Sequence, residues 1–196
     1  MTLIEGDRVR LRRIERGDLE SAAGFQHTLS ILEPLTQIAR LTDVFDQTGF
    51  WTEDAGAVVV EAEGRMVGTM QLYRSGACIH GYEIGYILHS EADRGKGYAS
   101  EGLRLLGDYL FAERPGCHRL QLIIETWNEA SARLAEACGY AREGILRKGR
   151  LLRRRRPARR LGLFAGAVTP SLSGRGHSPS RRARPAMVSA RRWAMS

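Results

Sequence analysis

Residues 57–74, AVVVEAEGRMVGTMQLYR, hold two runs of β-favouring residues on either side of the tetrapeptide AEGR. Runs rich in valine are typical of strands, and Gly64 tolerates the positive φ that a tight turn between antiparallel strands requires. The stretch therefore predicts a β-hairpin. GYEIGYIL at 81–88 predicts a further strand, so we expect a β-sheet at the centre of the fold.

The segment before the hairpin predicts one strand and two helices. RVRLRRI at 8–14 alternates apolar residues with arginines, which is typical of a half-exposed edge strand. Asp18 follows it as the expected N-cap of a helix. Apolar residues recur at helical spacing on both sides of Pro34, so we expect residues 19–50 to form two short helices.

The segment after the strand at 81–88 predicts a helix, a strand and a second helix. Apolar residues at positions 99, 103, 106 and 110 share one face of the first helix. RLQLIIE at 119–125 is typical of a buried strand, and the next helix has Asn128 as its N-cap and Gly139 just after its end. This order predicts an α+β domain over residues 1–150, with a mixed central sheet flanked by helices.

The tail differs in composition from this domain. Residues 151–196 contain 12 arginines but no lysine and no acidic residue, whereas residues 1–150 carry a net charge of −4. Such a composition is typical of a disordered segment, or of the translation of a shifted reading frame in GC-rich DNA, and only 161–168 has the composition of a strand. Because the positive charge is confined to the tail, we expect nucleic acid to bind only through non-specific contacts with it.

Membrane, disulfide-stabilised and metal-binding proteins are not expected. No run approaches the roughly 18 to 20 apolar residues that span a bilayer, and the first residues lack the apolar core of a secretory signal. We therefore expect a cytoplasmic protein without membrane contact. The cysteines are odd in number and lack the spacing of zinc ligands, so they predict neither a disulfide framework nor a metal site: Cys78, Cys117 and Cys138.

A glycine-rich loop, ADRGKGYASEG at 92–102, leads into the helix of the second half. Successive N–H groups of such a loop can converge on an anion, and the helix adds about half a positive elementary charge at its N-terminus. Gly95 and Gly97 allow close backbone approach, while Arg94 and Lys96 add positive charge, so we expect a phosphate group here. The loop matches neither the P-loop pattern nor a dinucleotide-binding fingerprint that opens a βαβ unit.

RGKGYA at 94–99 matches the signature [QR]-x-x-G-x-[GA] of the GNAT acetyltransferases, whose loop holds the pyrophosphate of acetyl-CoA. YEIGYIL, GLRLLGDYLF and NEASARLAEACGYAREGILR resemble the RimJ/RimL type, the ribosomal-protein N-terminal acetyltransferases, so the resemblance extends over 8–147. It implies a GNAT fold. In that fold the sheet is splayed between the fourth and fifth strands, here 81–88 and 119–125, to admit acetyl-CoA.

The resemblance also implies which residues bind the acetyl donor. Backbone groups of one strand pair with the pantetheine arm of CoA: Tyr86, Ile87 and Leu88. The loop residues expected around the pyrophosphate are Arg94, Gly95, Lys96, Gly97, Tyr98 and Ala99. Asn128 is expected to contact CoA, and the hydroxyl of Ser131 is expected near its sulfur. No metal is implied.

Amide formation requires a neutral amine, whereas a typical amine is an ammonium ion at pH 7, so a base must remove a proton. The resemblance gives this role to Glu83; a glutamate that faces water at a strand end is the alternative. Ser131 is expected to stabilise or protonate the departing thiolate, unless it is only a small interior residue. Many GNAT enzymes carry a tyrosine where this chain has Ala135, and we expect Tyr140 to be a core residue.

The resemblance implies an acyltransferase that moves an acetyl group directly from acetyl-CoA to a primary amine. We expect the acceptor to be a peptide N-terminus or an amine-bearing small molecule or antibiotic, and the enzyme to be a monomer or homodimer. After EGILR, however, the chain lacks the aspartate-containing hairpin of the family. Two alternatives therefore stay open: a catalytically impaired module that binds CoA as a sensor or partner, and a nucleic-acid binder that uses its arginine tail.

Overall fold

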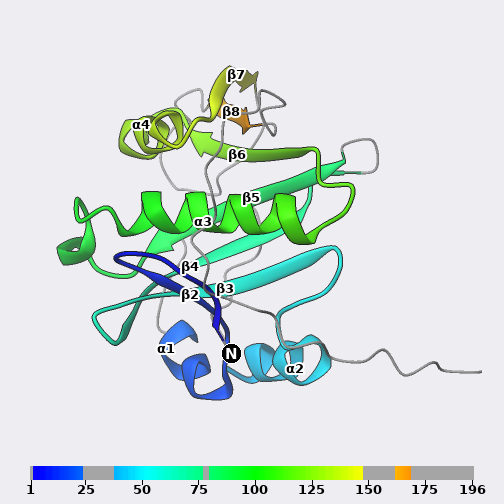
Figure 1. Ribbon diagram of the computed structural model, residues 1–196, viewed down its shortest axis with the longest axis vertical. Coiled ribbons are helices and arrows are strands. Elements are labelled where there is room, and N and C mark those ends of the chain that lie inside the picture. Colours follow the sequence, from blue (N-terminus) through cyan, green and yellow to red (C-terminus); the bar gives the residue numbers. More distant parts are fainter. Residues whose placement is uncertain (1, 24–37, 77–79, 148–161, 169–196) are drawn as a thin grey trace, which may run out of the picture.

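The computed structural model describes residues 2–23, 38–76, 80–147 and 162–168 (Figure 1). The helices are α1 (Leu19–Ala23), α2 (Ile38–Thr48), α3 (Tyr98–Glu113) and α4 (Glu129–Ala137), with short 3-10 helices η1 (Arg16–Asp18) and η2 (Glu91–Asp93). The strands are β1 (Thr2–Glu5), β2 (Arg10–Arg13), β3 (Ala55–Ala62), β4 (Arg65–Arg74), β5 (Gly81–Leu88), β6 (Arg119–Glu125), β7 (Ala141–Arg147) and β8 (Gly162–Val168). Cys78, His27 and most of the tail lie outside the described residues.

The strands form one mixed sheet in the order β1-β2-β3-β4-β5-β6-β8-β7. Neighbouring strands are antiparallel except β5 and β6, which are parallel. The α+β class and mixed sheet expected from the sequence are confirmed. The expected edge position of the strand within 8–14 is wrong, because β1 folds back beside it through a turn in which the N–H of Gly6 donates to the carbonyl of Val9 at 2.9 Å.

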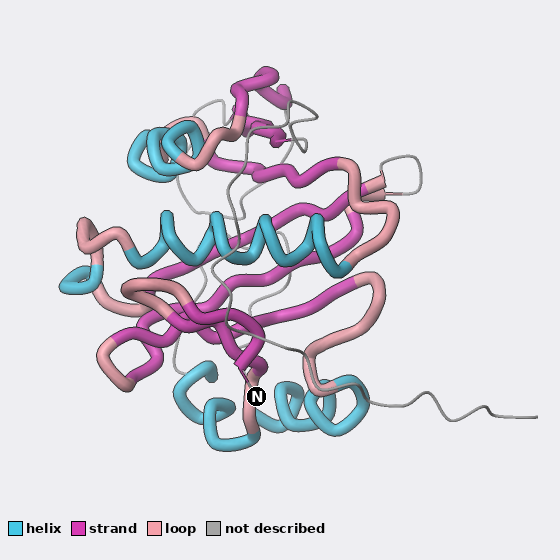
Figure 2. The backbone as a smooth tube through the Cα atoms, viewed as in Figure 1, coloured by secondary structure: helices cyan, strands magenta, loops and turns pink. Residues whose placement is uncertain are grey.

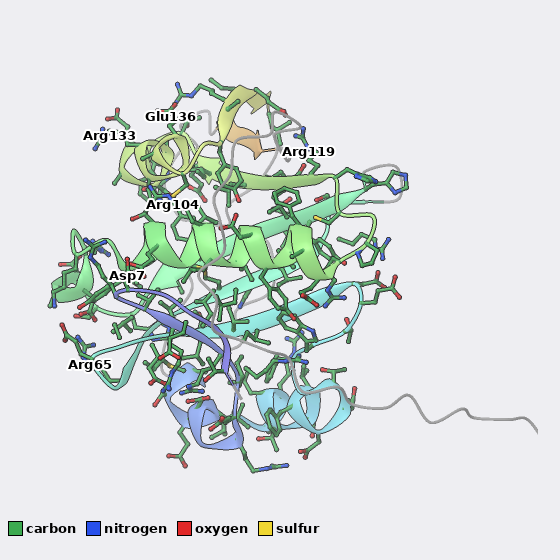
Figure 3. The ribbon with its side chains drawn as sticks, in the orientation of Figure 1. Asp7, Arg65, Arg104, Arg119, Arg133 and Glu136 are labelled. Carbon is green, nitrogen blue, oxygen red and sulfur yellow. The ribbon has the colours of Figure 1, made fainter. Side chains whose placement is uncertain are left out.

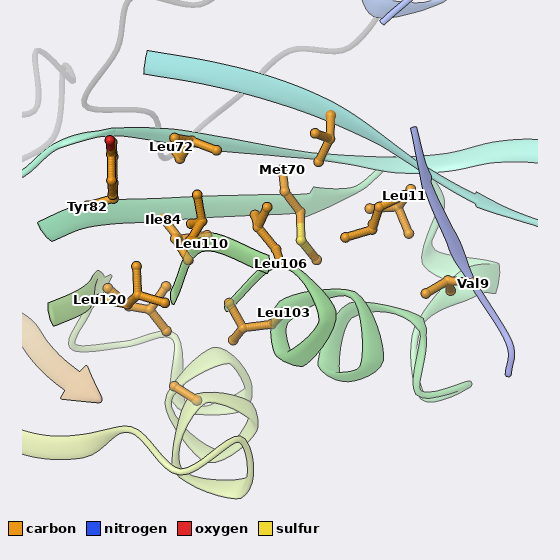
Figure 4. Packing of buried hydrophobic residues seen from close by; sticks show 14 of the residues in the cluster. Val9, Leu11, Met70, Leu72, Tyr82, Ile84, Leu103, Leu106, Leu110 and Leu120 are labelled. Carbon is orange, nitrogen blue, oxygen red and sulfur yellow. The ribbon is translucent and has the colours of Figure 1, made fainter. Parts of the chain in front are cut away.

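Helices cover both faces of this sheet (Figure 2). Side chains alternate between the two faces along each strand, so Val58 and Val60 of β3 belong to the cluster under α3, where Leu103, Leu106 and Leu110 are fully buried (Figure 4). Burying one such leucine contributes about 1.5–3 kcal/mol. The periodicity that predicted this helix is therefore the periodicity of its buried face.

The opposite face carries a second, smaller core. Ala57 and Val59 of β3 pack there with Leu19 of α1 and with Leu41 of α2 and Phe50, which follows it. The two short helices expected within 19–50 are present, although residues 24–37 lie outside the described part of the chain. The sheet thus separates an α3 face from an α1/α2 face, and these names are used below.

The predicted hairpin is confirmed at β3 and β4, where Glu63 and Gly64 both adopt positive φ. The predicted helix cap at Asp18 is wrong. Asp18 ends η1, and its carboxylate accepts hydrogen bonds from the N–H of Glu15 at 2.8 Å and from the guanidinium of Arg12 at 2.7 and 2.8 Å. Both partners precede Asp18 in the chain, whereas the side chain of an N-cap accepts from residues that follow it.

The expected splay between the strands at 81–88 and 119–125 is confirmed. These strands, expected as the fourth and fifth, are β5 and β6, because the sequence did not predict β1. They pair at three positions, Gly81 with Arg119, Tyr82 with Leu120 and Glu83 with Gln121. β5 stays paired with β4 along its whole length. The edge of β5 that faces β6 is therefore unpaired with β6 from Ile84 to Leu88.

The sheet is completed from the C-terminal part of the chain. The strand that the composition allowed at 161–168 is present as β8, which pairs with β6 on one side and with β7 on the other. β7 was not predicted. An ion pair at 2.5 Å joins Glu143 of β7 to Arg119 of β6, and Arg119 is labelled in Figure 3. The remainder of 148–196 lies outside the described residues, and the expectation of a disordered tail concerns those residues.

Candidate functional site

The glycine-rich loop connects β5 and η2 to the start of α3. Gly95 and Gly97 adopt φ of 77° and 84°, and Gly97 is the N-cap of α3. A left-handed backbone costs an ordinary residue roughly 1–2 kcal/mol, which explains glycine at both positions. The first N–H groups of a helix have no acceptor within the helix. Those of Tyr98 and Ala99 are therefore available to an anion at this turn.

The charged side chains of the loop have partners inside it. The guanidinium of Arg94 lies 2.8 Å from Glu91, and the ammonium of Lys96 lies 3.5 Å from Asp93. Asp93, only 1% exposed, also accepts two hydrogen bonds from Arg65 of β4, at 2.9 and 2.6 Å. These bonds hold the pKa of Asp93 below its usual range. Arg65 and Asp93 thereby fix the loop to the β3–β4 hairpin.

Arg8 is a cation at this loop that no local sequence pattern indicates. Its guanidinium lies 3.6 Å from the place that a Cβ on Gly97 would occupy, and 3.6 Å from the carboxylate of Glu101 in α3. Glu101 also accepts a hydrogen bond from the N–H of Arg8 at 2.8 Å. The turn between β1 and β2 is thus held against α3, which brings a basic side chain from a distant part of the chain to the loop.

Glu83 lies at the last paired position before the splay and is only 6% exposed. It therefore does not face water, which was the alternative expectation. Tyr73 of β4 donates its hydroxyl hydrogen to Oε1 of Glu83, and Gln121 of β6 donates from Nε2 to Oε2 at 3.0 Å. Burial, and then the hydrogen bond to Glu83, raise the pKa of Tyr73 above its usual range. The carboxylate is held across three strands.

Tyr73 and Gln121 were missed from the sequence because their role depends on strand register, which no local pattern specifies. Tyr73 lies opposite Glu83 in the β4–β5 pairing, and Gln121 lies opposite it in the β5–β6 pairing. Once the register of β4, β5 and β6 is known, alternation along each strand puts Tyr73, Glu83 and Gln121 on one face of the sheet. That face is the α1/α2 face, because Tyr82 and Ile84, the neighbours of Glu83, belong to the α3-side core.

The α1/α2 face next to Glu83 has little side-chain bulk on β5. Gly85 is the next residue of β5 on this face, it is exposed, and no atom of the described residues lies within 4 Å of the position of an added Cβ. Its partner in β4 is Gln71, which together with Thr69 and His89 supplies the polar part of a pocket under α1 and α2. The rest of the pocket lining is apolar: Ile14, Leu19, Ala22, Leu41, Phe50 and Ala57.

Ser131 lies across the splay, on the opposite face. The side chain of Asn128 caps α4 as predicted, since its Oδ1 accepts a hydrogen bond from the N–H of Ser131 at 3.2 Å. The hydroxyl oxygen of Ser131 lies 2.6 Å from that of Tyr86 in β5. Burial raises the pKa of Tyr86 to about 12, although the hydrogen bond to Ser131 lowers it. Only the backbone of Tyr86 had been expected to take part in binding.

The other candidates have ordinary positions. Ile87 and Leu88 are half-buried and continue the pairing of β5 with β4. Ala135 is fully buried, and Tyr140 is 4% exposed within the α3-side core, as expected. Cys138 donates its thiol hydrogen to the carbonyl of Ser100 at 3.4 Å, and burial raises its pKa.

The described residues contain neither a group of metal ligands nor a helix that could span a membrane. Within 2–23, 38–76, 80–147 and 162–168, no three His, Cys, Asp or Glu side chains are grouped so that they could hold a metal ion. None of the helices seen in these ranges combines the length and apolar composition needed to cross a bilayer.

Comparison with known proteins agrees with this geometry. A family model described as an acetyltransferase (GNAT) domain matches residues 8–141. The probable N-acetyltransferase YjcK of Bacillus subtilis is 28% identical over 161 residues, which cover 74% of this chain and 87% of YjcK.

Solved structures share the fold. The spermidine N-acetyltransferase of Vibrio cholerae in complex with CoA and spermine has a TM-score of 0.69 at 21% identity, covering 83% of this chain and 95% of that chain. A GNAT-family acetyltransferase of Bacillus anthracis has a TM-score of 0.67 at 22% identity, covering 86% of this chain and 98% of that chain. The family match extends over more than half of the sequence, and the chain therefore belongs to the GNAT acetyltransferases.

Proposed function

We propose that this acetyltransferase transfers the acetyl group of acetyl-CoA directly to a primary amine that enters from the α1/α2 face, with Glu83 as the base. The observation that carries the proposal is the buried carboxylate of Glu83 beside the open position at Gly85, at the root of the splay. This arrangement supports a proton acceptor at the point where an amine from the α1/α2 face meets a donor bound in the splay. The N-acetyltransferase class follows from the family.

The residues present fit acetyl-CoA. The loop at 94–99 and the first N–H groups of α3 suit the pyrophosphate, because both present backbone hydrogens and the helix dipole favours an anion. The backbone of Tyr86, Ile87 and Leu88 lies on the edge of β5 that is unpaired with β6, which suits the amide groups of the pantetheine arm. Asn128 and Ser131 start α4 on the other side of the splay. Bound there, acetyl-CoA supplies the activated acyl group.

Glu83 is suited to receive the proton of the amine. Tyr73 and Gln121 hold both of its oxygens in place, so its orientation is fixed before the amine arrives, and preorganisation of this kind lowers a barrier at no cost during the reaction. The amine nitrogen attacks the thioester carbonyl carbon, the carboxylate of Glu83 takes the N–H proton, and the thiolate departs. An enzyme-bound acyl group is not needed.

The acceptor class is proposed more broadly. The RimJ/RimL resemblance favours a peptide or protein N-terminus, whereas a Vibrio cholerae relative of the same fold was solved with spermine. The net charge of −4 over residues 1–150 favours a cationic acceptor of either kind. The pocket beside Gln71 is mostly apolar. This favours an acceptor that carries an apolar group close to its amino group. We place the enzyme in the cytoplasm, as a monomer or homodimer.

The proposal is tested by calorimetry of acetyl-CoA binding, run beside a thiol-release assay with peptides, polyamines and small amines. We expect Glu83→Gln to lower kcat by about 100-fold, since general base catalysis typically contributes at least that much, and to leave acetyl-CoA affinity within about twofold. Glu113→Gln, at an exposed position at the end of α3, is the charge-matched control. Unchanged turnover in Glu83→Gln would remove Glu83 from the base role.

A catalytically impaired module is the second candidate, because the chain departs from the family pattern after Arg147. Acetyl-CoA binding without thiol release across the whole panel would favour it. Turnover with any amine would exclude it.

A further inference from the structure

Strand β5 presents two polar side chains to opposite faces of the sheet. Side chains alternate along a strand, and Glu83 and Tyr86 are three residues apart. Glu83 and Gly85 therefore face α1 and α2, while Tyr86 lies on the α3 side, where it packs against the larger core. Both residues border the splay. The two faces of one strand thus offer different chemistry to a substrate bound between β5 and β6.

The Tyr86 side chain reaches across the splay to α4. Its hydroxyl oxygen lies 2.6 Å from the hydroxyl oxygen of Ser131, where either group can be the donor, and 3.3 Å from the carbonyl oxygen of Ser131. Ser131 is itself positioned by Asn128, the N-cap of the same helix. Ser131 is therefore held by its backbone at the start of α4 and by its hydroxyl from β5, so the orientation of the hydroxyl depends on Tyr86.

Neighbouring groups do not offer the same contact. Ala135, one turn further along α4, has no polar atom in its side chain and is fully buried. The hydroxyl of Tyr140 is buried and has no hydrogen-bond partner among the described residues, so it is not joined to Ser131. The thiol of Cys138 is engaged with Ser100. Of these groups, Tyr86 alone makes a hydrogen bond to the Ser131 hydroxyl.

We propose that Tyr86 is a positioning residue for the leaving group: its hydroxyl donates to Oγ of Ser131, so that the Ser131 hydrogen points to the sulfur of CoA. This inference rests on the proposed function for the location of CoA in the splay. A phenol is a stronger acid than an aliphatic alcohol, which makes Tyr86 the better donor of the pair. Chains of hydrogen bonds strengthen one another, so the serine becomes a better donor to an anion.

The chemistry balances without a proton from Tyr86. The C–S bond of the thioester breaks and its electron pair stays on sulfur, where the hydrogen bond from Ser131 stabilises the negative charge. The proton lost by the amine goes to Glu83 and then to solvent, and the thiolate takes a proton from solvent on release. Glu83 serves the nucleophile on one face of β5, and Tyr86 with Ser131 serves the leaving group on the other. Tyr86 stays protonated throughout, in keeping with its raised pKa.

A double-mutant cycle tests the link between the two hydroxyls. We expect Tyr86→Phe to lower kcat about tenfold, with little change in the KM for acetyl-CoA. The Ser131 hydroxyl then loses its orientation, and the hydrogen bond that it makes to the charged thiolate is worth about one such factor. In a Ser131→Ala background the same change should have no further effect, since coupled groups are non-additive. An equal loss in both backgrounds would mean a packing role and would overturn the proposal.

Tyr82→Phe is the matched control. Tyr82 lies on the same strand and the same face, and its hydroxyl donates to the carbonyl of Glu53 at 2.8 Å, away from the splay. Removing that hydroxyl should leave kcat unchanged, and thermal unfolding of both variants separates stability from turnover.

A binding measurement tests the same idea without turnover. The probes are CoA and desulfo-CoA, compared by calorimetry from pH 7 to pH 9.5. Thiols ionise near a pKa of about 8.5, so preference for CoA over desulfo-CoA should grow above that pH, reaching about tenfold in the wild type. It should disappear in Tyr86→Phe and in Ser131→Ala but persist in Tyr82→Phe.

Each outcome decides the matter. A preference that survives Tyr86→Phe, or a wild type without any preference, overturns the positioning role. A normal preference without turnover on any amine supports that role and refutes the proposed acetyl transfer. Failure to bind CoA at all overturns both.

Discussion

At the scale of single residues, the site depends on contacts between distant parts of the chain. The burial of Glu83 could be predicted from its apolar neighbours in YEIGYIL, and the cap at Asn128 from its helix. Tyr73, Gln121 and the side-chain role of Tyr86 could not be predicted, because they depend on how strands and helices meet. Arg8 is the extreme case, since its approach to Gly97 is created by the turn between β1 and β2.

Arg8 leads to a prediction about donor binding. Its side chain is 64% exposed and makes a long ion pair at 3.6 Å with Glu101, so the guanidinium is able to turn toward an anion at the loop. We expect Arg8→Gln to weaken acetyl-CoA binding about three- to tenfold, as for loss of one charge-assisted contact, and to reduce its salt dependence. Arg133→Gln, on the outer surface of α4 (Figure 3), is the control, and equal affinities by calorimetry would contradict the prediction.

At the scale of elements, most helices and strands could be predicted because they carry a clear local period. The hairpin β3–β4 and helix α3 are such cases, with alternation in the first and a leucine stripe in the second. β1 was missed because it has only four residues, and β7, AREGILR, was missed because charged residues interrupt its apolar pattern. Each is stabilised by its neighbour in the sheet. The loop before α3 was predicted as a phosphate site from its glycines, but its attachment to β4 was not.

That attachment gives a pH-dependent prediction. Asp93 has a folded pKa below its usual value because of Arg65. Its pair therefore stabilises the fold fully above the unfolded pKa of about 3.9, and this contribution is lost as pH falls through the lower folded pKa. We expect Asp93→Asn to lower the melting temperature clearly at pH 7, and the difference from wild type to shrink below pH 4. Acetyl-CoA binding should weaken in parallel, because the loop loses its anchor.

The control for Asp93 is Asp54, which forms an exposed ion pair with Arg74 at 2.6 Å. Exposed pairs contribute about 0–1 kcal/mol, so Asp54→Asn should leave the melting temperature nearly unchanged. Equal effects of the two variants, or a difference for Asp93→Asn that persists below its folded pKa, would contradict the role given to the Arg65–Asp93 pair.

At the scale of the whole molecule, the sheet is closed by a strand from the segment that looked least like a folded domain. The sequence allowed a strand at 161–168, yet its position between β6 and β7 could not be predicted, since nothing local specifies which strands it joins. β8 pairs with Leu120 to Glu125 of β6 on one side and with β7 on the other. Without it, β6 becomes an open edge beside the splay.

Two truncations test this dependence. A chain that ends at residue 172 keeps β8, and we expect it to retain a cooperative thermal transition and acetyl-CoA binding. A chain that ends at residue 150 loses the partner of both β6 and β7, so these strands expose unpaired N–H and C=O groups and favour association between molecules. We expect it to melt at a much lower temperature, to aggregate and to bind acetyl-CoA poorly. Equal stability of the two chains in calorimetry would mean that β8 contributes nothing to the sheet, and that 1–150 suffices for the fold.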